Sequence, residues 1–418
     1  MSASLLKELF ARKQLGVKLG LETMHALARE IGNPEKDLNF IHIAGTNGKG
    51  STAAMLAAIL QKAGYKVGLF TSPHLISFGE RIQINRVPLS EEKIMELYEA
   101  LQPALFEVEA NASLHTPTFF EITTALALLA FREAQVDWVI WETGLGGRLD
   151  STNIVQPKFS ILTAISFDHT QWLGTTLSQI ATEKAGIIKK KVPVICAPQV
   201  EEVKQVIQQR AEEQEALCFF VNQKNIFLES ETCEGQQFSY RSTSYSLSLL
   251  GSHQRQNAAV VLEMVCQLRE SGVNISEEAV VNGLKTVTWP ARFQFLQKDP
   301  LAILDGAHNE AGIEGLVQQY RSLFGEAKIN LIFGVLADKN IDAMVNQLLP
   351  IIKKVALVAP MSSRALKPVI AASCFAVKDC DTAIFSNFQQ AWLRFQGEPV
   401  LITGSLYLAG EVLGCLRF

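Results

Sequence analysis

Seven residues near the start of the chain have the types and spacing to bind a phosphate group: Gly45-Thr46-Asn47-Gly48-Lys49-Gly50-Ser51. Glycines let the backbone turn tightly enough for several N–H groups to point at one anion. Lys49 adds a full positive charge that can reach the β- and γ-phosphates of a nucleotide. The spacing differs from the usual P-loop, because Gly50 follows the lysine and the hydroxyl comes one place later. A plain glycine turn before a buried helix is the alternative, but it gives Lys49 no packing role.

Three further polar side chains follow hydrophobic, strand-like runs: Ser72, Glu142 and His169. In an open α/β sheet, ligands bind at the carboxyl ends of the strands, where these residues are expected. A carboxylate suits Mg²⁺, which prefers oxygen ligands and retains waters. A lone histidine at a strand end is more often a structural hydrogen-bonding group, but the three residues together favour a metal site beside the loop.

Lys184 stands where a predicted helix meets Gly186, in the stretch Glu183-Lys184-Ala185-Gly186-Ile187-Ile188. The residues alone favour a solvated lysine near a helix C-terminus, where the helix dipole stabilises a cation.

The elements that must position these residues alternate between strands and helices. Strands are predicted at 40–44, 66–71, 137–141, 159–165 and 192–196, and helices at 5–31 (broken near Gly16 and Gly20), 52–63, 91–105 and 119–134. A polar loop is predicted from Ser72 to about Asn85. This alternation predicts an α/β fold whose first domain has a P-loop-type, mostly parallel sheet with helices on both faces.

The pattern changes after residue 224. Alternating apolar residues between Asn225 and Leu249 predict a small antiparallel insertion at the sheet edge, followed by helices at 253–271 and 277–285. A second, smaller Rossmann-like α/β pattern then begins, with strands at 301–304, 330–335, 354–358 and 400–403 and helices such as 311–323 and 341–352. We therefore place a domain boundary near residue 290, giving domains 1–290 and 291–418, with Trp289-Pro290-Ala291-Arg292 as the hinge.

Composition excludes several classes of protein. The 418 residues are 48% hydrophobic and 19% charged, which allows a large core, and the net charge of −4 argues against a general nucleic-acid binder. Seven cysteines without C-x-x-C spacing read as reduced thiols, so a cytoplasmic protein is expected. Charged residues interrupt the first twenty residues, so no signal peptide is expected, and no apolar run approaches the ~20 residues that span a bilayer.

The chain resembles the folylpolyglutamate synthase/dihydrofolate synthase family of the Mur ligase superfamily, in its bacterial bifunctional form. The matching stretches are 45–51, Thr71-Ser72-Pro73-His74-Leu75, Glu142 to Asn153, Asp168-His169, Glu183 to Ile187, Gly251 to Asn257, Asp305-Gly306-Ala307-His308-Asn309 and Thr403-Gly404-Ser405-Leu406-Tyr407. They run in order across nearly the whole chain, and the irregular glycine loop is the form seen in that family. One departure is Ala291, where the family usually has glycine.

This resemblance implies an ATP- and Mg²⁺-dependent amide ligase. The carboxylate of dihydropteroate or of a reduced folate would attack the γ-phosphate, and the amine of L-glutamate would then displace phosphate from the acyl phosphate. The expected partners are therefore small molecules, with no nucleic acid and no membrane, and a monomer is expected.

The resemblance also implies roles for individual residues. The phosphates would be held by Gly45, Thr46, Asn47, Gly48, Lys49, Gly50 and Ser51, and magnesium by Ser72, Glu142 and His169. Lys184 would be carbamylated and act with Lys49, Glu142 and His169, while the nucleotide would also be contacted by Asn257, Arg292 and Asp305. Glutamate would be contacted by His308 and Ser405, and the pterin side would be formed by Val17, Lys18, Leu19, Gly20, Thr118, Phe119, Phe120, Glu121, Leu149, Asp150 and Ser151. Without the family, Asn257 reads as a helix-face amide, His308 as a turn histidine, and Phe119 or Phe120 as core. We expect Asp150→Ala to reduce ligation of dihydropteroate more than extension of folates.

Three other functions compete with this one. A cell-wall Mur ligase usually has a separate N-terminal domain for its UDP-sugar, and 44 residues before Gly45 are too few for one. A P-loop kinase or regulatory NTPase would not need a second α/β domain that carries Asp305, His308 and Ser405. A non-catalytic nucleotide-binding module would not need Lys49, Glu142 and His169 together. A folylpolyglutamate synthase without the dihydropteroate activity is the alternative within the family.

Overall fold

The computed structural model describes residues 8–16, 18–376 and 380–416, which form two compact units. The first unit consists of the described residues up to Gln223 together with Asn257–Leu284. The second consists of Lys224–Gln256 and the described residues from Lys285 onward. The units thus group residues 224–256 with the C-terminal part of the chain, and the boundary near residue 290 stays a prediction.

The first unit contains a sheet of eight strands in the order β4-β3-β2-β5-β1-β6-β7-β8. Their bounds are β1 Phe40–Ala44, β2 Val67–Phe70, β3 Ile82–Ile84, β4 Val87–Pro88, β5 Trp138–Glu142, β6 Phe159–Leu162, β7 Val194–Cys196 and β8 Cys218–Phe220. The six strands from β2 to β8 in this order pair in parallel, and β3 and β4 add an antiparallel edge. The predicted mostly parallel α/β sheet is confirmed, and β1, which leads into the glycine loop, lies inside it.

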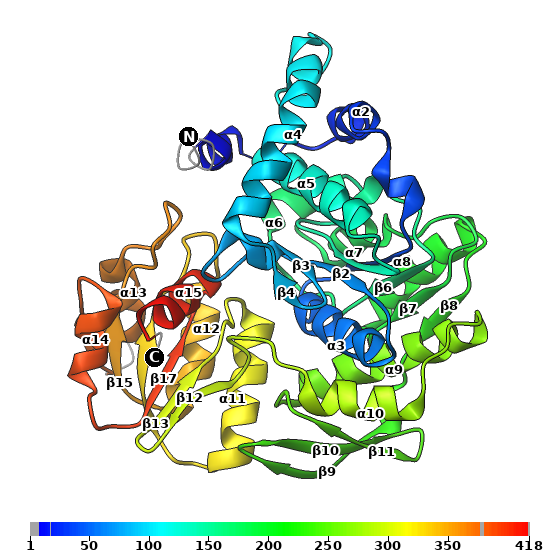
Figure 1. Cartoon of the computed structure of the whole chain (residues 1–418). Helices are drawn as coiled ribbons and strands as arrows, with labels where there is room; N and C mark the ends of the chain where they lie inside the picture. Colours follow the sequence, from blue (N-terminus) through cyan, green and yellow to red (C-terminus); the bar gives the residue numbers. More distant parts are fainter. Residues whose placement is uncertain (1–7, 17, 377–379, 417–418) are drawn as a thin grey trace. The chain divides into compact units, whose positions relative to one another are not determined.

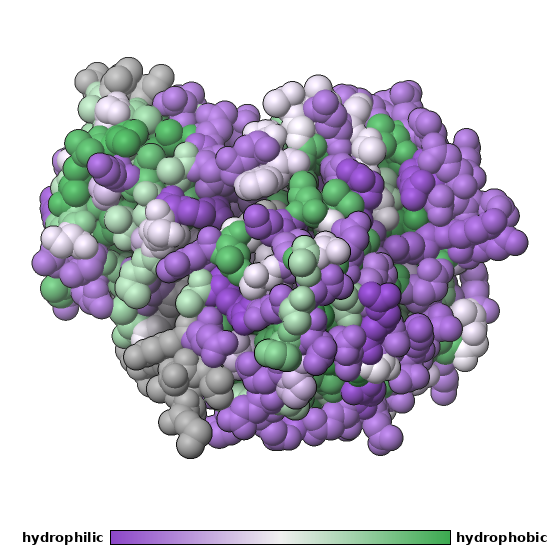
Figure 2. Space-filling view, turned by 90° about the horizontal axis from the view of Figure 1, so that it is seen from above, coloured by the Kyte–Doolittle hydropathy of each residue, from purple (hydrophilic) through white to green (hydrophobic). Residues whose placement is uncertain are grey.

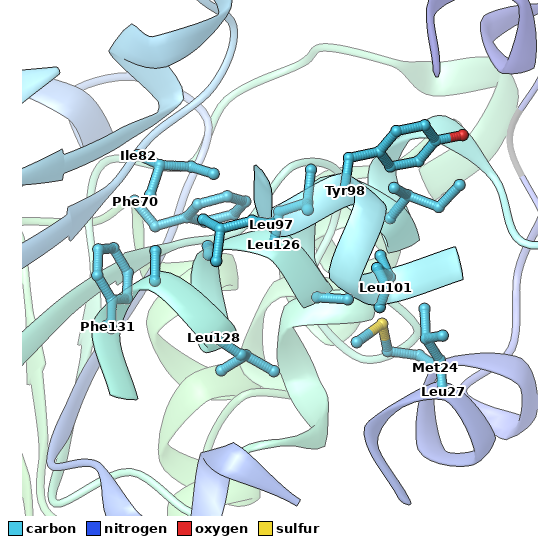
Figure 3. Close-up of a cluster of buried hydrophobic side chains, with 14 of the residues drawn as sticks. Met24, Leu27, Phe70, Ile82, Leu97, Tyr98, Leu101, Leu126, Leu128 and Phe131 are labelled. Carbon is cyan, nitrogen blue, oxygen red and sulfur yellow. The ribbon is translucent and has the colours of Figure 1, made fainter. Parts of the chain in front are cut away.

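Helices cover this sheet on both sides (Figure 1). They are α2 Glu22–Glu30, α3 Lys49–Lys62, α4 Glu91–Ala110, α5 Phe119–Glu133, α6 Thr170–Leu173, α7 Leu177–Ala185, α8 Glu201–Glu213 and, later in the chain, α9 Ser252–Glu270 and α10 Glu277–Thr286, with short 3-10 turns such as η3 Phe78–Arg81 and η4 Ser151–Ile154. Helices α2, α4 and α5 contribute side chains such as Met24, Leu101, Leu126 and Phe131 to one buried cluster, which also contains Phe70 of β2 (Figure 3). Burial of this apolar area stabilises the face of the sheet on which α5 lies.

The segment after β2 differs from its prediction. It contains η3 and strand β3, whereas a polar loop was expected as far as Asn85. The carboxylate of Glu80 accepts hydrogen bonds from the N–H groups of Leu75, Ile76 and Ser77, at 2.7, 3.0 and 2.8 Å. These bonds hold the polar segment in a fixed turn. An alternation of apolar and polar residues does not predict such a turn.

The second unit contains two further sheets. The antiparallel strands β9 Ile226–Thr232, β10 Gly235–Tyr240 and β11 Thr243–Leu247 form a sheet of their own, so the predicted insertion exists but does not extend the edge of a larger sheet. The other sheet has the order β12-β13-β17-β14-β15-β16 and is parallel except for β12.

The elements of the six-stranded sheet confirm the predicted second α/β pattern. Its strands are β12 Gln294–Lys298, β13 Leu301–Leu304, β14 Ile329–Phe333, β15 Ile352–Leu357, β16 Asp381–Ile384 and β17 Val400–Thr403, and its helices are α11 Glu310–Phe324, α12 Ile341–Leu348, α13 Pro368–Ala376, α14 Phe388–Arg394 and α15 Leu406–Cys415. No residue ranges were predicted for β8, β12, β16 and α13 to α15.

The described surface is largely polar on the face shown in Figure 2, with hydrophobic side chains in small groups. Within the described ranges, no helix combines the length and the apolar character needed to cross a bilayer. The cytoplasmic location and the monomeric state stay predictions.

Candidate active site

The glycine loop joins β1 to α3, and two of its glycines have backbone angles that favour glycine. Gly45 has φ +152°, and a Cβ added there would lie 1.9 Å from Oγ1 of Thr163. Gly48 has φ +91° and is the N-cap of α3, so no side chain from the cap bonds to the first helical turn. The N-terminus of α3 therefore presents N–H groups and the positive end of a helix dipole, as an anion site requires.

The segment after β6 fixes the position of the loop. The N–H groups of Thr46 and Asn47 both donate to the carbonyl of Ala164, at 2.9 and 3.2 Å. The hydroxyl of Thr46 donates to the carbonyl of Ser166 at 3.0 Å and accepts from its N–H at 3.1 Å. These bonds hold the segment that leads to Asp168 and His169 against the loop.

Lys49 turns back over the loop that precedes it. Its Nζ donates to the carbonyl oxygens of Gly45 and Thr46, at 3.2 and 3.3 Å. It also lies 3.9 Å from Oε1 of Glu142. The ammonium group is thus held at the mouth of the loop, where it can neutralise phosphate charge.

Glu142 ends β5 and is 2% exposed. Its Oε2 accepts a hydrogen bond of 3.1 Å from the N–H of Ser72. Strand β5 pairs with both β1 and β2 in register, which explains why Glu142, the glycine loop and Ser72 come together. Two of the three predicted metal ligands are therefore neighbours.

His169 precedes α6 with a φ of +50°. Its side chain is 33% exposed, and its Nε2 lies 3.9 Å from Oδ1 of Asp168. Among the residues that the structure describes, no three His, Cys, Asp or Glu side chains form a cluster able to hold a metal ion. The role of His169 as a magnesium ligand stays a prediction.

Lys184, in the last turn of α7, is not the solvated lysine that its neighbours in the sequence favoured. It is 4% exposed, and its Nζ donates to the carbonyl of Gly45 at 2.8 Å. Burial, with the nearby charge of Lys49, lowers the pKa of Lys184 from 10.5 to about 7, against the opposing effect of Asp168 and Asp150. The structure thus brings a second buried amine, with a lowered pKa, to the same carbonyl that Lys49 contacts.

Asn257, in α9, lies beside the glycine loop. A Cβ added to Gly48 would lie 2.4 Å from its Oδ1, and Asn257 is buried. Asn257 is thus adjacent to the glycine loop, and its contact with adenine stays a prediction.

The predicted pterin side gathers at the start of α5 and in the loop after β5. Thr118 and Glu121 form a capping box, in which Oε2 of Glu121 accepts from the N–H and the hydroxyl of Thr118, both at 2.8 Å. Phe119 is buried and stacks on Phe10 with ring centroids 5.8 Å apart, so the core interpretation holds for Phe119. Phe120 is partly buried, and its ring lies over Gly144.

Both carboxylate oxygens of Asp150 accept hydrogen bonds from groups of its own loop. Oδ2 accepts from the N–H groups of Gly144 and Leu145, at 3.0 and 2.7 Å, and Oδ1 accepts from the N–H and hydroxyl of Thr152, at 3.1 and 2.5 Å. Burial raises the pKa of the Asp150 carboxyl. Leu149 and Ser151 are the sequence neighbours of Asp150. Of the other residues predicted for the pterin side, Lys18, Leu19 and Gly20 lie before α2, and Val17 lies outside the described residues.

The predicted site residues of the second unit also form turns. Asp305 accepts from the N–H groups of Phe293 and Ala307, both at 2.7 Å, and burial raises the pKa of its carboxyl. Arg292 donates to the carbonyl of Ala291, at 2.8 Å. Ala291 has φ +55°, a left-handed conformation that glycine adopts more easily, which accounts for the glycine usual in the family.

His308 and Ser405 lie in neighbouring turns of that unit. His308 Nδ1 is 2.8 Å from the carbonyl oxygen of Gly306. The next carbonyl, that of Ala307, accepts from the N–H of Gly404 at 3.1 Å. The hydroxyl of Ser405 caps α15 by accepting from the N–H of Leu408 at 3.1 Å. Their contacts with glutamate, and those of Arg292 and Asp305 with nucleotide, stay predictions.

Several residues that shape the site were not predicted. Thr163 and Ser166 pack on the glycine loop, and Glu80 orders the segment that carries Ser72. The spacing Ser77-x-x-Glu80 is a capping-box pattern and could have identified Glu80.

Comparison with known proteins gives matches over most of the chain. The model of the Mur ligase middle domain matches residues 43–265, and that of the Mur ligase glutamate ligase domain matches residues 291–406. The chain is 39% identical to the dihydrofolate synthase/folylpolyglutamate synthase of Bacillus subtilis, over 96% of each chain.

Solved structures agree with these matches. A folylpolyglutamate synthase of Mycobacterium tuberculosis complexed with ADP and AMPPCP has a TM-score of 0.90 at 30% identity, covering 100% of this chain and 99% of that one. FolC of Escherichia coli in complex with DHPP and ADP has a TM-score of 0.86 at 30% identity, covering 99% and 97%.

The glycine loop gives a direct test of phosphate binding. Gly45→Ala must displace the loop or Thr163, so we expect the dissociation constant for ADP to rise at least ~10-fold, or about 1.4 kcal/mol. Gly64→Ala is the matched control, because Gly64 has φ +92° but a Cβ there meets no atom within 4 Å. Isothermal titration calorimetry should find ADP binding in the control close to the parent value. Equal ADP affinity in Gly45→Ala and the parent would refute the assignment of this loop.

Proposed function

Because this chain belongs to the folylpolyglutamate synthase/dihydrofolate synthase family of the Mur ligase superfamily, we propose that it is an ATP-dependent ligase that joins L-glutamate to dihydropteroate and to reduced folates. The observation that carries this proposal is the meeting of Lys49, Glu142 and Lys184 around the loop that begins at Gly45. A simple phosphate-binding protein does not require a buried carboxylate and a second buried amine at this loop.

The reaction we propose has two steps. A carboxylate oxygen of the pteroate or folate forms a bond to the γ-phosphorus, and the bond from that phosphorus to ADP breaks. The amine nitrogen of glutamate then attacks the acyl carbon, phosphate leaves, and the nitrogen loses a proton. In this chain the N-terminus of α3 and Lys49 would hold the charge of the phosphates during the first step.

The residues around the loop are compatible with Mg²⁺. Glu142 supplies a buried carboxylate next to Ser72, and Mg²⁺ commonly takes one or two protein oxygens together with phosphate oxygens and waters. Ser72, Glu142 and His169 would hold the ion. When bound, Mg²⁺ would neutralise phosphate charge that Lys49 alone does not balance.

Lys184 is suited to carbamylation. Its amine is buried, and the neutral form that reacts with carbon dioxide is favoured there. A carbamate would replace an ammonium group, which repels a nearby metal, with an anionic oxygen. The change would also remove the repulsion between Lys184 and Lys49.

The residues predicted to contact the pterin bear on whether both activities are present. Phe120 is only partly buried and offers an aromatic face. Its ring lies against Gly144, whose N–H donates to the carboxylate of Asp150. Because both carboxylate oxygens of Asp150 bind loop groups, Asp150→Ala should loosen the loop and lower both activities, which revises the selective loss expected from the sequence. A contact of Asp150 with the pterin stays a prediction.

Glu142 provides a test of the metal site. We expect Glu142→Ala to lower kcat by on the order of 10²–10³-fold, as removal of a group that stabilises transition-state charge often does. Glu142→Gln is the matched variant, because its amide oxygen can still accept from Ser72 but carries no charge. Ligation rates measured over a range of magnesium concentrations should be low in both variants. Near-parent turnover in Glu142→Gln would show that only the hydrogen bond matters.

Lys184 provides a test of the carbamate. Lys184→Ala should be nearly inactive, because no carbamate can form, and acetate or formate should restore part of the activity by occupying the vacated space. The parent should carry an extra ~44 Da on this side chain. The rate of ADP release with and without added carboxylate measures the effect. Lys190→Ala is the control, because Lys190 is on the same segment but its exposed side chain pairs with Glu215. Full activity in Lys184→Ala would exclude the role.

Product analysis tests the function itself. Purified protein with ATP, magnesium and glutamate should convert dihydropteroate to dihydrofolate and lengthen the glutamate tail of tetrahydrofolate, as followed by mass spectrometry. Extension of tetrahydrofolate without reaction of dihydropteroate would leave a folylpolyglutamate synthase. Failure with both substrates would refute the proposal.

A further inference from the structure

The loop after β5 and the end of α7 interlock through their backbones. The N–H of Arg148 donates to the carbonyl of Glu183 at 2.7 Å. A Cβ on Gly147 would lie 2.8 Å from the carbonyl oxygens of both Glu183 and Lys184, and one on Gly186 would lie 2.3 Å from Cβ of Arg148. The two segments therefore approach as closely as glycine permits.

Asn153, in η4, joins these segments from within. It is 4% exposed, and its Nδ2 donates to the carbonyls of Arg148 and Gly186, at 2.9 and 3.2 Å. Its own carbonyl accepts from Nζ of Lys189 at 3.0 Å. One side-chain amide thus spans both chain segments.

The bond to Gly186 falls at the end of the helix that carries Lys184. Helix α7 ends at Ala185, and Gly186 is its C-cap residue. Carbonyls at a helix C-terminus lack helical partners and need donors from elsewhere. Asn153 supplies such a donor two residues beyond Lys184, whose Nζ contacts Gly45.

We propose that Asn153 is a positioning residue for Lys184. By fixing the last turn of α7, Asn153 sets where the Lys184 side chain meets the glycine loop. This inference rests on the proposed function, in which Lys184 acts at the phosphate site.

The chemistry of the contact explains the residue type. Two carbonyl oxygens require two donors, and the amide NH₂ supplies both. This orientation leaves Oδ1 buried, and within the described part of the chain it has no hydrogen-bond partner. The side-chain amide of Asn153 therefore acts only as a hydrogen-bond donor. An aspartate has the same size but no such donor.

Three variants of one residue test the proposal. Asn153→Ala removes both bonds, and we expect kcat to fall ~10–100-fold with little change in the dissociation constant for ADP. Asn153→Asp keeps the size but sets a carboxylate against two carbonyls, so it should be slower than Asn153→Ala. Asn153→Ser keeps one donor and should lie between Asn153→Ala and the parent. A space-filling role predicts the opposite order, with Asn153→Asp the better variant.

Ser160→Ala is the matched control. Ser160 is buried, and its hydroxyl donates to the carbonyl of Ile187 at 3.2 Å, so its loss removes one buried bond to the same segment without touching the loop after β5. It should stay within ~3-fold of the parent kcat. Melting curves and ADP binding check the fold of every variant.

A second readout follows Lys184 without turnover. After equilibration with ¹³C-bicarbonate, the parent should show a carbamate signal that Lys184→Arg lacks, and Asn153→Ala should reduce it. The proposal would be overturned if Asn153→Ala kept the kcat and the carbamate signal of the parent. It would also be overturned if Asn153→Asp were faster than Asn153→Ala. A parent without the signal would fail the carbamate part of the proposed function, and the order of kcat values would still decide the role of Asn153.

Discussion

The site depends on one carbonyl oxygen, that of Gly45. The ammonium groups of Lys49 and Lys184 both donate to it, at 3.2 and 2.8 Å. Thr163 leaves no room for a side chain at this position, and the φ of +152° suits glycine. The carbonyl can receive two amines only because the chain turns tightly here and because Thr163, just after β6, closes one side of the turn. Movement of this one peptide would displace both amines and the start of α3.

Burial and the nearby charge of Lys49 lower the pKa of Lys184, because two protonated amines at one carbonyl repel each other. Glu142 lies 3.9 Å from Lys49 and offsets part of the charge, and burial forces Lys184 toward the neutral amine. An anion at the N-terminus of α3 would satisfy Lys49, and a carbamate would turn Lys184 from a repelling group into an attracting one. Phosphate, a divalent cation and carbon dioxide would each change the balance of charge among Lys49, Lys184 and the nearby carboxylates Glu142, Asp150 and Asp168.

The sequence predicted the elements with long, clear periods and the residues that end buried strands. Strand β1, helix α5 and Glu142 are where hydrophobic patterning places them. Burial of Lys184 could not be predicted in this way, because it depends on Gly147 and Gly186 letting two distant segments approach. The wall formed by Thr163 and the turn held by Glu80 are likewise tertiary contacts of polar residues, and neither leaves a hydrophobic period in the sequence. The family resemblance singled out Lys184 and Asn257, which local patterning gave no reason to choose.

Several carboxylates near the site build turns, and this separates residues that shape the site from residues that could react. Asp150, Asp305 and Glu80 each accept at least two backbone N–H groups. Glu142 accepts a bond from the N–H of Ser72 through Oε2, and its Oε1 lies 3.9 Å from Nζ of Lys49. A carboxylate whose oxygens are filled by its own loop has little capacity left for a ligand, since each oxygen has two lone-pair sites. Membership of a motif therefore does not assign a residue to the chemistry. The proposed role of Glu142 rests instead on its place at the glycine loop, where its Oε1 lies 3.9 Å from Nζ of Lys49.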